Sequence, residues 1–116
     1  ANRLAKDPRV SKVRYPGLTT DPYHERAKSF MKGFGAMISF EVKATTAQID
    51  QMCDFSKLIT NATSLGGVES IWERRRRWAT ESHTIPENLI RFSVGIEDVN
   101  DLWADIQFAF TAAKIL

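Results

Sequence analysis

The stretch 89–98, Leu-Ile-Arg-Phe-Ser-Val-Gly-Ile-Glu-Asp, most constrains the fold, because it changes from a strand pattern to a helix start. Apolar and polar residues alternate, so Ile90 and Phe92 fall on one face of a strand and Arg91 on the other. A glycine then allows a turn, and Asp98 can cap a following helix. The pattern predicts a rigid strand that presents a fixed cation. Pattern alone favours a plain surface strand with a solvated arginine; a ligand-binding arginine is the alternative.

Other segments show strand or helix patterns. Residues 36–43 alternate most clearly, and Thr45 with Gln48 has the spacing of a capping box at a helix start. Residues 98–114 carry apolar side chains three and four apart, which predicts the strongest helix. Weaker patterns predict a helix end over 1–7, a strand over 10–15, a helix over 22–32 and a strand over 68–72. This order predicts an α/β fold, a two-layer α+β sandwich whose mostly antiparallel sheet is covered by helices on one face.

Composition limits the classes of partner and compartment. The 116 residues suit one domain, and a net charge of +2 is too small to indicate nucleic acid or an anionic membrane as the main partner. The single cysteine cannot form an internal disulfide, which suits a reducing compartment such as the cytoplasm. No apolar run has membrane-spanning length, and we find no signal-peptide pattern. The chain opens in mid-pattern, as a fragment or a domain of a longer protein does.

Three local patterns have both a functional and a structural interpretation. Ser64 begins a Ser-Leu-Gly-Gly motif that can bring backbone close to an anion, but a tight loop between strands is the favoured interpretation. Four arginines at 74–77 lie between Trp72 and Trp78, and nearby glutamates favour a salt-bridged surface over a nucleic-acid site. The two histidines have no neighbours at metal-ligand spacing, and Cys53 falls on an apolar helix stripe. The sequence therefore predicts no catalytic residue and no metal site in this chain.

Ordered motifs carry a family resemblance over nearly the whole chain. They are Val-Arg-Tyr-Pro-Gly-Leu at 13–18, Gly-Phe-Gly-Ala-Met-Ile-Ser-Phe at 33–40, Ser-Leu-Gly-Gly-Val-Glu-Ser at 64–70 and the stretch at 89–98, followed by Asp-Leu at 101–102. Between the first two motifs lie Pro22, His24-Glu25 and Ala27-Lys28. In this order and spacing they resemble the C-terminal domain of the Cys/Met-metabolism family of pyridoxal-phosphate (PLP) enzymes.

The resemblance implies the small C-terminal, substrate-binding domain of the type I aspartate-aminotransferase fold, covering residues 1–116. It also implies a large N-terminal domain, absent from this chain, that binds PLP and supplies the Schiff-base lysine. The fragment alone is then expected to be inactive. By the match of the last motif, Arg91 holds the substrate α-carboxylate through its guanidinium fork. Ser64 contributes to the same pocket, and Thr63 lies where family members differ in substrate preference.

The resemblance further implies that the full-length protein acts on a small amino acid in trans-sulfuration, within cysteine and methionine metabolism. We expect a cystathionine γ-synthase that joins cysteine to an activated homoserine. Cystathionine or methionine γ-lyase and homoserine sulfhydrylase are alternatives within the family, and a non-catalytic α/β ligand- or partner-binding module is the alternative outside it. A cytoplasmic homotetramer that binds neither nucleic acid nor membrane is also implied. Residues 74–87 replace a Pro-Ala-x-Met-Thr-His segment of many members, which leaves the exact specificity open.

Overall fold

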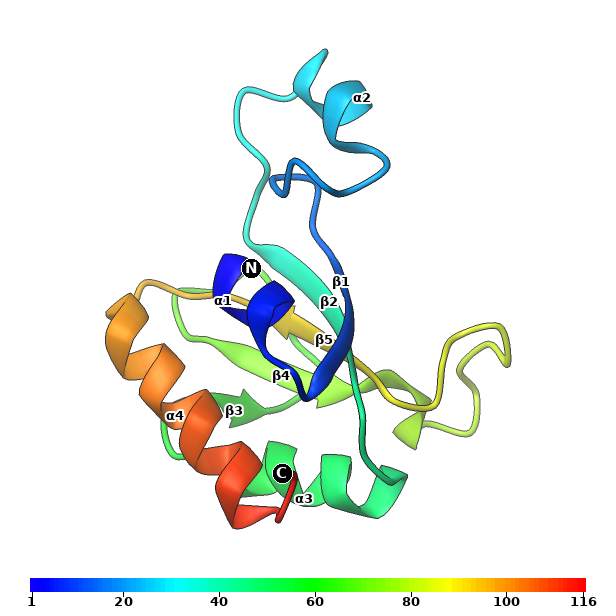
Figure 1. Ribbon diagram of the computed structural model, residues 1–116, viewed down its shortest axis with the longest axis vertical. Coiled ribbons are helices and arrows are strands. Elements are labelled where there is room, and N and C mark those ends of the chain that lie inside the picture. The colour runs from blue at the N-terminus through cyan, green and yellow to red at the C-terminus, as the bar shows by residue number, and fades with distance from the viewer.

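A five-stranded sheet forms the centre of the computed structural model, which describes residues 1–116 (Figure 1). Its strands lie in the order β1-β2-β5-β4-β3. Neighbouring strands are antiparallel, except that β3 and β4 run parallel. The strands are β1 (Val10–Arg14), β2 (Met37–Val42), β3 (Thr60–Asn61), β4 (Ile71–Arg74) and β5 (Leu89–Ser93). The helices are α1 (Asn2–Lys6), α2 (His24–Lys28), α3 (Thr46–Phe55), α4 (Val99–Ala112) and a 3-10 turn, η1 (Arg75–Arg77).

The predicted strand around Arg91 is β5, the middle strand of the sheet. Its Phe92 lies opposite Ile38 of β2 on one side and Trp72 of β4 on the other. These side chains share one buried cluster with apolar residues of α1, α3 and α4, of which Phe110 in α4 is fully buried. The three helices therefore cover one face of the sheet, and the predicted two-layer arrangement with a mostly antiparallel sheet is confirmed.

Polar side chains fix the positions of the helices in this layer. Thr45 and Gln48 form the predicted capping box at the start of α3, with N···O distances of 3.2 and 3.3 Å. The carboxylate of Asp98 caps α4 by accepting two backbone N–H groups of its first turn, at 2.8 and 3.2 Å. Asp105, within α4, is a buried carboxylate that the sequence did not single out. It accepts the backbone N–H groups of residues 57–59 at 2.8 to 2.9 Å and so ties α4 to the segment before β3.

The helix predicted over 22–32 is shorter in the structure, where α2 forms little more than one turn. It belongs to an arm, residues 16–36, that projects from the sheet between β1 and β2 (Figure 1). Ala27 is the one buried residue of α2, and Phe30 beyond it is 72% exposed. A longer helix is absent because the arm offers few apolar contacts to support one, and short helices depend on such packing.

The strand predicted over 68–72 is displaced by about three residues, since β4 begins at 71. Residues 62–70 form a loop instead. The buried Ser70 fixes the end of this loop: its hydroxyl donates to the carboxylate of Glu97 at 2.8 Å and accepts the backbone N–H of Gly95 at 2.8 Å. These side-chain hydrogen bonds satisfy groups that strand pairing would otherwise satisfy, so pairing starts after them.

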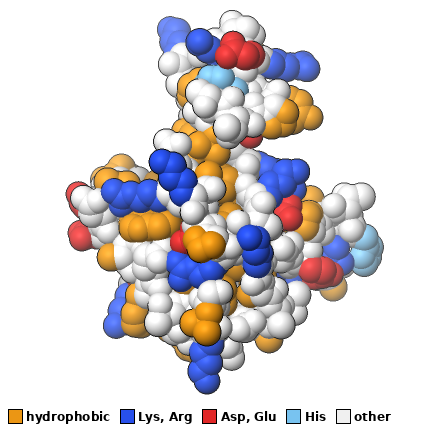
Figure 2. All heavy atoms as spheres, in the orientation of Figure 1, with side chains coloured by type: hydrophobic (Ala, Val, Ile, Leu, Met, Phe, Trp, Pro, Cys, Tyr) orange, Lys and Arg blue, Asp and Glu red, His pale blue; other side chains and the backbone are white.

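Charged and hydrophobic side chains are mixed over the surface shown in Figure 2, where basic side chains form no single large patch. Two large hydrophobic side chains of the arm, Tyr23 and Phe30, are 67% and 72% exposed. None of the helices combines the length and the apolar composition that crossing a membrane requires.

Candidate functional site

A row of polar side chains crosses four strands on the sheet face away from the helices. The strand register places Arg14 of β1 beside Ser39 of β2. Ser39 lies beside Arg91 of β5, and Arg91 lies beside Glu73 of β4. Residues paired in this way point to the same face of a sheet. Arg91 therefore faces away from the apolar core, as the sequence predicted.

A pocket of about 390 Å³ lies along this row. Arg14, Ser39 and Arg91 line it from the sheet. Arg75 and Glu81 line it from the connecting segment that joins β4 to β5. Three guanidinium groups thus face the pocket together with one carboxylate. Arg14 is also paired with Glu41, and Arg75 with Glu73, so the attraction for an anionic ligand depends on the donors that Arg91 leaves free.

Arg91 is fixed through one of its three side-chain nitrogens. Its Nη2 atom donates to the backbone carbonyl groups of Thr63 and Ser64, the latter at 3.4 Å, and to Oε1 of Glu73 at 3.1 Å. The Nε and Nη1 atoms donate to no acceptor within the chain, and the side chain is 20% exposed. Since a guanidinium group carries five N–H donors, the three on Nε and Nη1 are available to a carboxylate while Nη2 is held in place.

Thr63 and Ser64 lie next to Arg91, although it is their backbone carbonyl groups that make the contact. Both residues are exposed, in the loop before β4. The backbone N–H of Gly66 donates to the hydroxyl oxygen of Ser93 at 2.8 Å, which holds this loop against β5. Gly66 has a φ of +78°, a backbone conformation that favours glycine. The structure thus brings the three predicted site residues together, and their contact with a substrate stays a prediction.

Glu73 is a charged residue of this site that the sequence interpretation missed. Its side chain is fully buried, and burial by itself raises the pKa of a carboxyl group. Hydrogen bonds from Trp78 and Arg75 outweigh this effect, so the pKa of Glu73 lies below its usual value and the group is ionised at neutral pH. Alternation points this glutamate away from Trp72 only in a strand that begins at residue 71, whereas the sequence pattern predicted a strand over 68–72 that ends before it. Its carboxylate accepts hydrogen bonds from Arg75, Arg77 at 3.1 Å, Arg91 at 3.1 Å, Trp78 at 3.0 Å and Thr63 at 3.2 Å.

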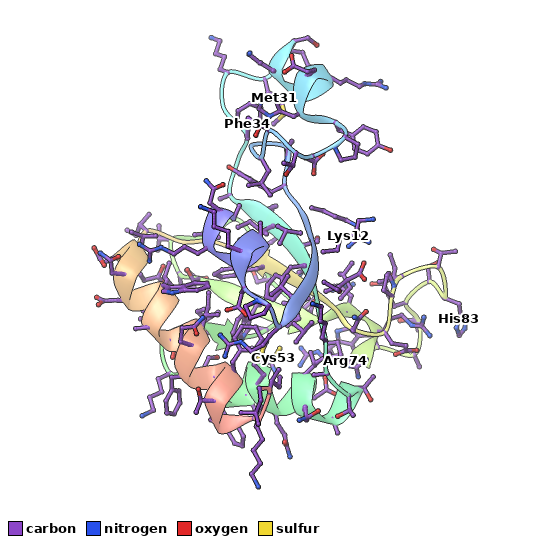
Figure 3. The ribbon with its side chains drawn as sticks, viewed as in Figure 1. Lys12, Met31, Phe34, Cys53, Arg74 and His83 are labelled. Atoms are coloured by element: carbon purple, nitrogen blue, oxygen red, sulfur yellow. The ribbon has the colours of Figure 1, made fainter.

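The arginine run 74–77 is a salt-bridged surface, as the sequence predicted. Arg74, labelled in Figure 3, lies on the helix side of the sheet. It makes two hydrogen bonds with Asp50 of α3, at 2.6 and 2.9 Å. The hydrogen bond from Arg75 lowers the pKa of Glu81 from its usual value. The pairs are Arg74 with Asp50 and Glu87, Arg75 with Glu73 and Glu81, Arg76 with Glu87, and Arg77 with Glu73.

The two histidines and the cysteine lie outside the pocket. His24 stacks on Phe34 within the arm at a centroid distance of 5.2 Å, and its Nδ1 lies 2.6 Å from the carbonyl oxygen of Pro16. His83 lies in the connecting segment, at the edge of the molecule in Figure 3. Cys53 is buried on α3, and burial raises the pKa of its thiol to about 12. The cysteine is therefore an unreactive core residue, which confirms the interpretation of its pattern.

The pocket suits a carboxylate but offers no group that holds PLP covalently. Covalent attachment of PLP needs a lysine amine. All seven lysines of the chain are exposed, and none lines the pocket beside Arg91. The residues present therefore fit the binding of an amino-acid substrate and do not fit the attachment of the cofactor.

Known proteins resemble this chain along nearly its whole length. Cystathionine γ-synthase of Mycobacterium leprae is 44% identical over 114 residues, which cover 94% of this chain and 29% of that protein. Cystathionine γ-lyase of Dictyostelium discoideum is 45% identical over 116 residues, covering 93% of this chain and 30% of that protein. The crystal structure of cystathionine γ-synthase from Xanthomonas oryzae in complex with cystathionine matches with a TM-score of 0.90 and 35% identity, over 98% of this chain and 32% of that chain.

These comparisons agree with a sequence model of one family. The chain spans less than a third of the length of each relative, and synthases and lyases match it about equally well. The family described as Cys/Met metabolism PLP-dependent enzyme matches residues 1–111. On this match and these identities, the chain belongs to the PLP-dependent enzymes of cysteine and methionine metabolism.

Proposed function

We propose that this chain is the C-terminal, substrate-binding domain of a PLP-dependent trans-sulfuration enzyme. Its large cofactor-binding domain would then lie outside these residues. The chain spans only about 30% of the length of its relatives, which supports this division. The pocket also contains no lysine that could hold PLP. The exposed Tyr23 and Phe30 of the arm also support it, because exposed hydrophobic side chains are typical of a surface that another part of a protein covers.

Arg91 is the residue that binds the α-carboxylate of the amino-acid substrate in this proposal. The observation that carries it is the one-sided anchoring of the guanidinium group, which leaves Nε and Nη1 without acceptors at the pocket. When bound, PLP supplies an electron sink for cleavage of bonds to the substrate α-carbon. Arg91 holds the carboxylate still and so orients those bonds. Thr63 and Ser64 lie beside it, and their backbone carbonyl groups hold its Nη2 atom.

A cystathionine γ-synthase is the finer assignment that we propose. It would join cysteine to an activated homoserine. The synthase of M. leprae and the cystathionine complex of the X. oryzae synthase support it. The D. discoideum lyase has nearly the same identity, 45% against 44%, which makes a γ-lyase the second candidate. A homotetrameric, cytoplasmic enzyme stays a prediction from the family resemblance.

The experiment that tests this function is product analysis with the full-length enzyme loaded with PLP. One reaction contains an activated homoserine ester and cysteine, and the other contains cystathionine alone. A synthase forms cystathionine in the first reaction. A γ-lyase releases cysteine, 2-oxobutanoate and ammonia in the second. If neither reaction gives a product, the trans-sulfuration assignment is wrong.

A further inference from the structure

A fully buried carboxylate, Glu73, lies directly beside the carboxylate-binding arginine. Three guanidinium groups contact it, those of Arg75, Arg77 and Arg91. An ionised carboxylate in a buried position is costly unless it is paired, and this one is paired on both oxygens. Glu81 is the one further carboxylate bonded to this group of arginines, so the cluster keeps one positive charge in excess.

The contacts of Glu73 reach Arg91 by two routes. Directly, Oε1 accepts from Nη2 at 3.1 Å. Indirectly, Oε2 of Glu73 accepts a hydrogen bond from the hydroxyl of Thr63 at 3.2 Å. The backbone carbonyl of Thr63 in turn accepts a hydrogen bond from the same Nη2 atom of Arg91. Glu73, Thr63 and Arg91 thus form a closed set of contacts. This set restrains the guanidinium group from the side opposite Nε and Nη1.

We propose that Glu73 is a positioning residue that holds Arg91 in the orientation that receives the substrate carboxylate. This inference rests on the proposed function of Arg91. Glu73 does not compete with the substrate, because it bonds to Nη2 and leaves Nε and Nη1 to the ligand. It also keeps Arg75 and Arg77 beside Arg91 despite the repulsion between like charges.

The variant Glu73→Gln separates positioning from a simple effect of charge. Glutamine keeps the size of the side chain and one acceptor oxygen but removes the negative charge. If Glu73 acted only through its charge, its loss would strengthen the attraction of the pocket for an anion, and KM would fall. If Glu73 positions Arg91, the three arginines move apart, and KM for the amino-acid substrate rises. We expect a rise of about tenfold, with a smaller change in kcat.

The test uses the full-length enzyme loaded with PLP, with Asp50→Asn as the matched control. Asp50 also makes a two-bond pair with an arginine of the run, but on the helix side and away from the pocket. KM, kcat and the absorbance of bound PLP are measured for both variants. An unchanged or lower KM in Glu73→Gln overturns the inference. If Glu73→Gln does not fold, Glu73→Asp is used instead, because aspartate keeps the charge on a shorter side chain. A raised KM in Glu73→Asp supports the inference, and a wild-type KM in this variant overturns the inference.

A double-variant comparison distinguishes positioning from general destabilisation. In an Arg91→Lys background, Glu73→Gln should change KM by less than twofold, because the guanidinium group that it positions is gone. An equal change in both backgrounds would show a purely structural role and overturn the inference. If Arg91→Ala itself leaves KM unchanged, the proposed function fails; if it raises KM while Glu73→Gln does not, only the role of Glu73 is wrong.

Discussion

Replacing Arg91 by alanine in the full-length enzyme should raise KM for the amino-acid substrate steeply and leave PLP binding nearly intact. Truncating one partner of a buried, hydrogen-bonded charge pair costs about 2–5 kcal/mol. Arg91 is one-fifth exposed, and Arg75 lines the same pocket and still attracts an anion after the change. We therefore expect about 3 kcal/mol, which corresponds to roughly a hundredfold loss in kcat/KM at about 1.4 kcal/mol for each factor of ten.

The fold should tolerate this change, because Glu73 keeps its contacts with Arg75 and Arg77 when Arg91 is removed. Arg91→Lys keeps the charge and loses the planar fork, so its KM should lie between those of the wild type and the alanine variant. Arg3→Ala is the control, since the exposed Arg3 donates to Asn100 of α4 and does not line the pocket. Steady-state kinetics and the absorbance of bound PLP are the measurements. A KM within twofold of wild type in Arg91→Ala would refute the assignment of the carboxylate site.

Two further predictions concern stability, measured by urea unfolding. Asp105→Ala removes an acceptor of three backbone N–H groups and should lower the free energy of unfolding by about 3 kcal/mol. The control Asp101→Ala changes an exposed residue of the same helix and should lower it by less than about 1 kcal/mol. Equal losses in the two variants would contradict the role of Asp105 in tying α4 to the segment before β3. The hydrogen bond from Arg9 lowers the pKa of Asp7 from 3.8 to about 2. The pKa of Asp7 is lower in the folded state than in the unfolded state, so its ionised form stabilises the fold. This contributes about 2 kcal/mol to the free energy of unfolding above pH 4, and the contribution is lost as the pH falls from about 4 to 2. Asp7→Asn should flatten the fall in stability over that range, and an unchanged pH profile would count against the pair.

Much of the fold follows from local patterns in the sequence. The strand around Phe92, the strand around Phe40 and the helix after Asp98 all have strict periodicity, and the structure has each of them. The two errors fall where local pattern is weak. The arm lacks the apolar contacts that would extend α2, and the start of β4 is set by hydrogen bonds of Ser70 to residues far along the chain. Contacts of that kind cannot be read from a short window of sequence.

The candidate site was predictable in part, for a related reason. Alternation places Arg91 on the polar face, and the family motif names Thr63 and Ser64 beside it. Neither signal reveals Glu73, because its environment depends on where β4 begins and on the fold of the connecting segment. A buried glutamate with several basic partners is recognisable only once those partners are placed in space.

The two faces of β5 link the stability of the fold to the geometry of the site. Ile90 and Phe92 are buried against the helices on either side of Arg91 along the strand. A register shift of one residue would move Arg91 into the core and expose these two side chains, so the packing of the core fixes which way the arginine points. The position of this cation is therefore resistant to change. The loop before β4 and the connecting segment after it are free of that constraint. The loop holds Nη2 of Arg91 through its backbone carbonyl groups, and the connecting segment supplies the other wall of the pocket. Differences in substrate between synthases and lyases should accordingly map to these two segments, since β5 is too constrained to encode them.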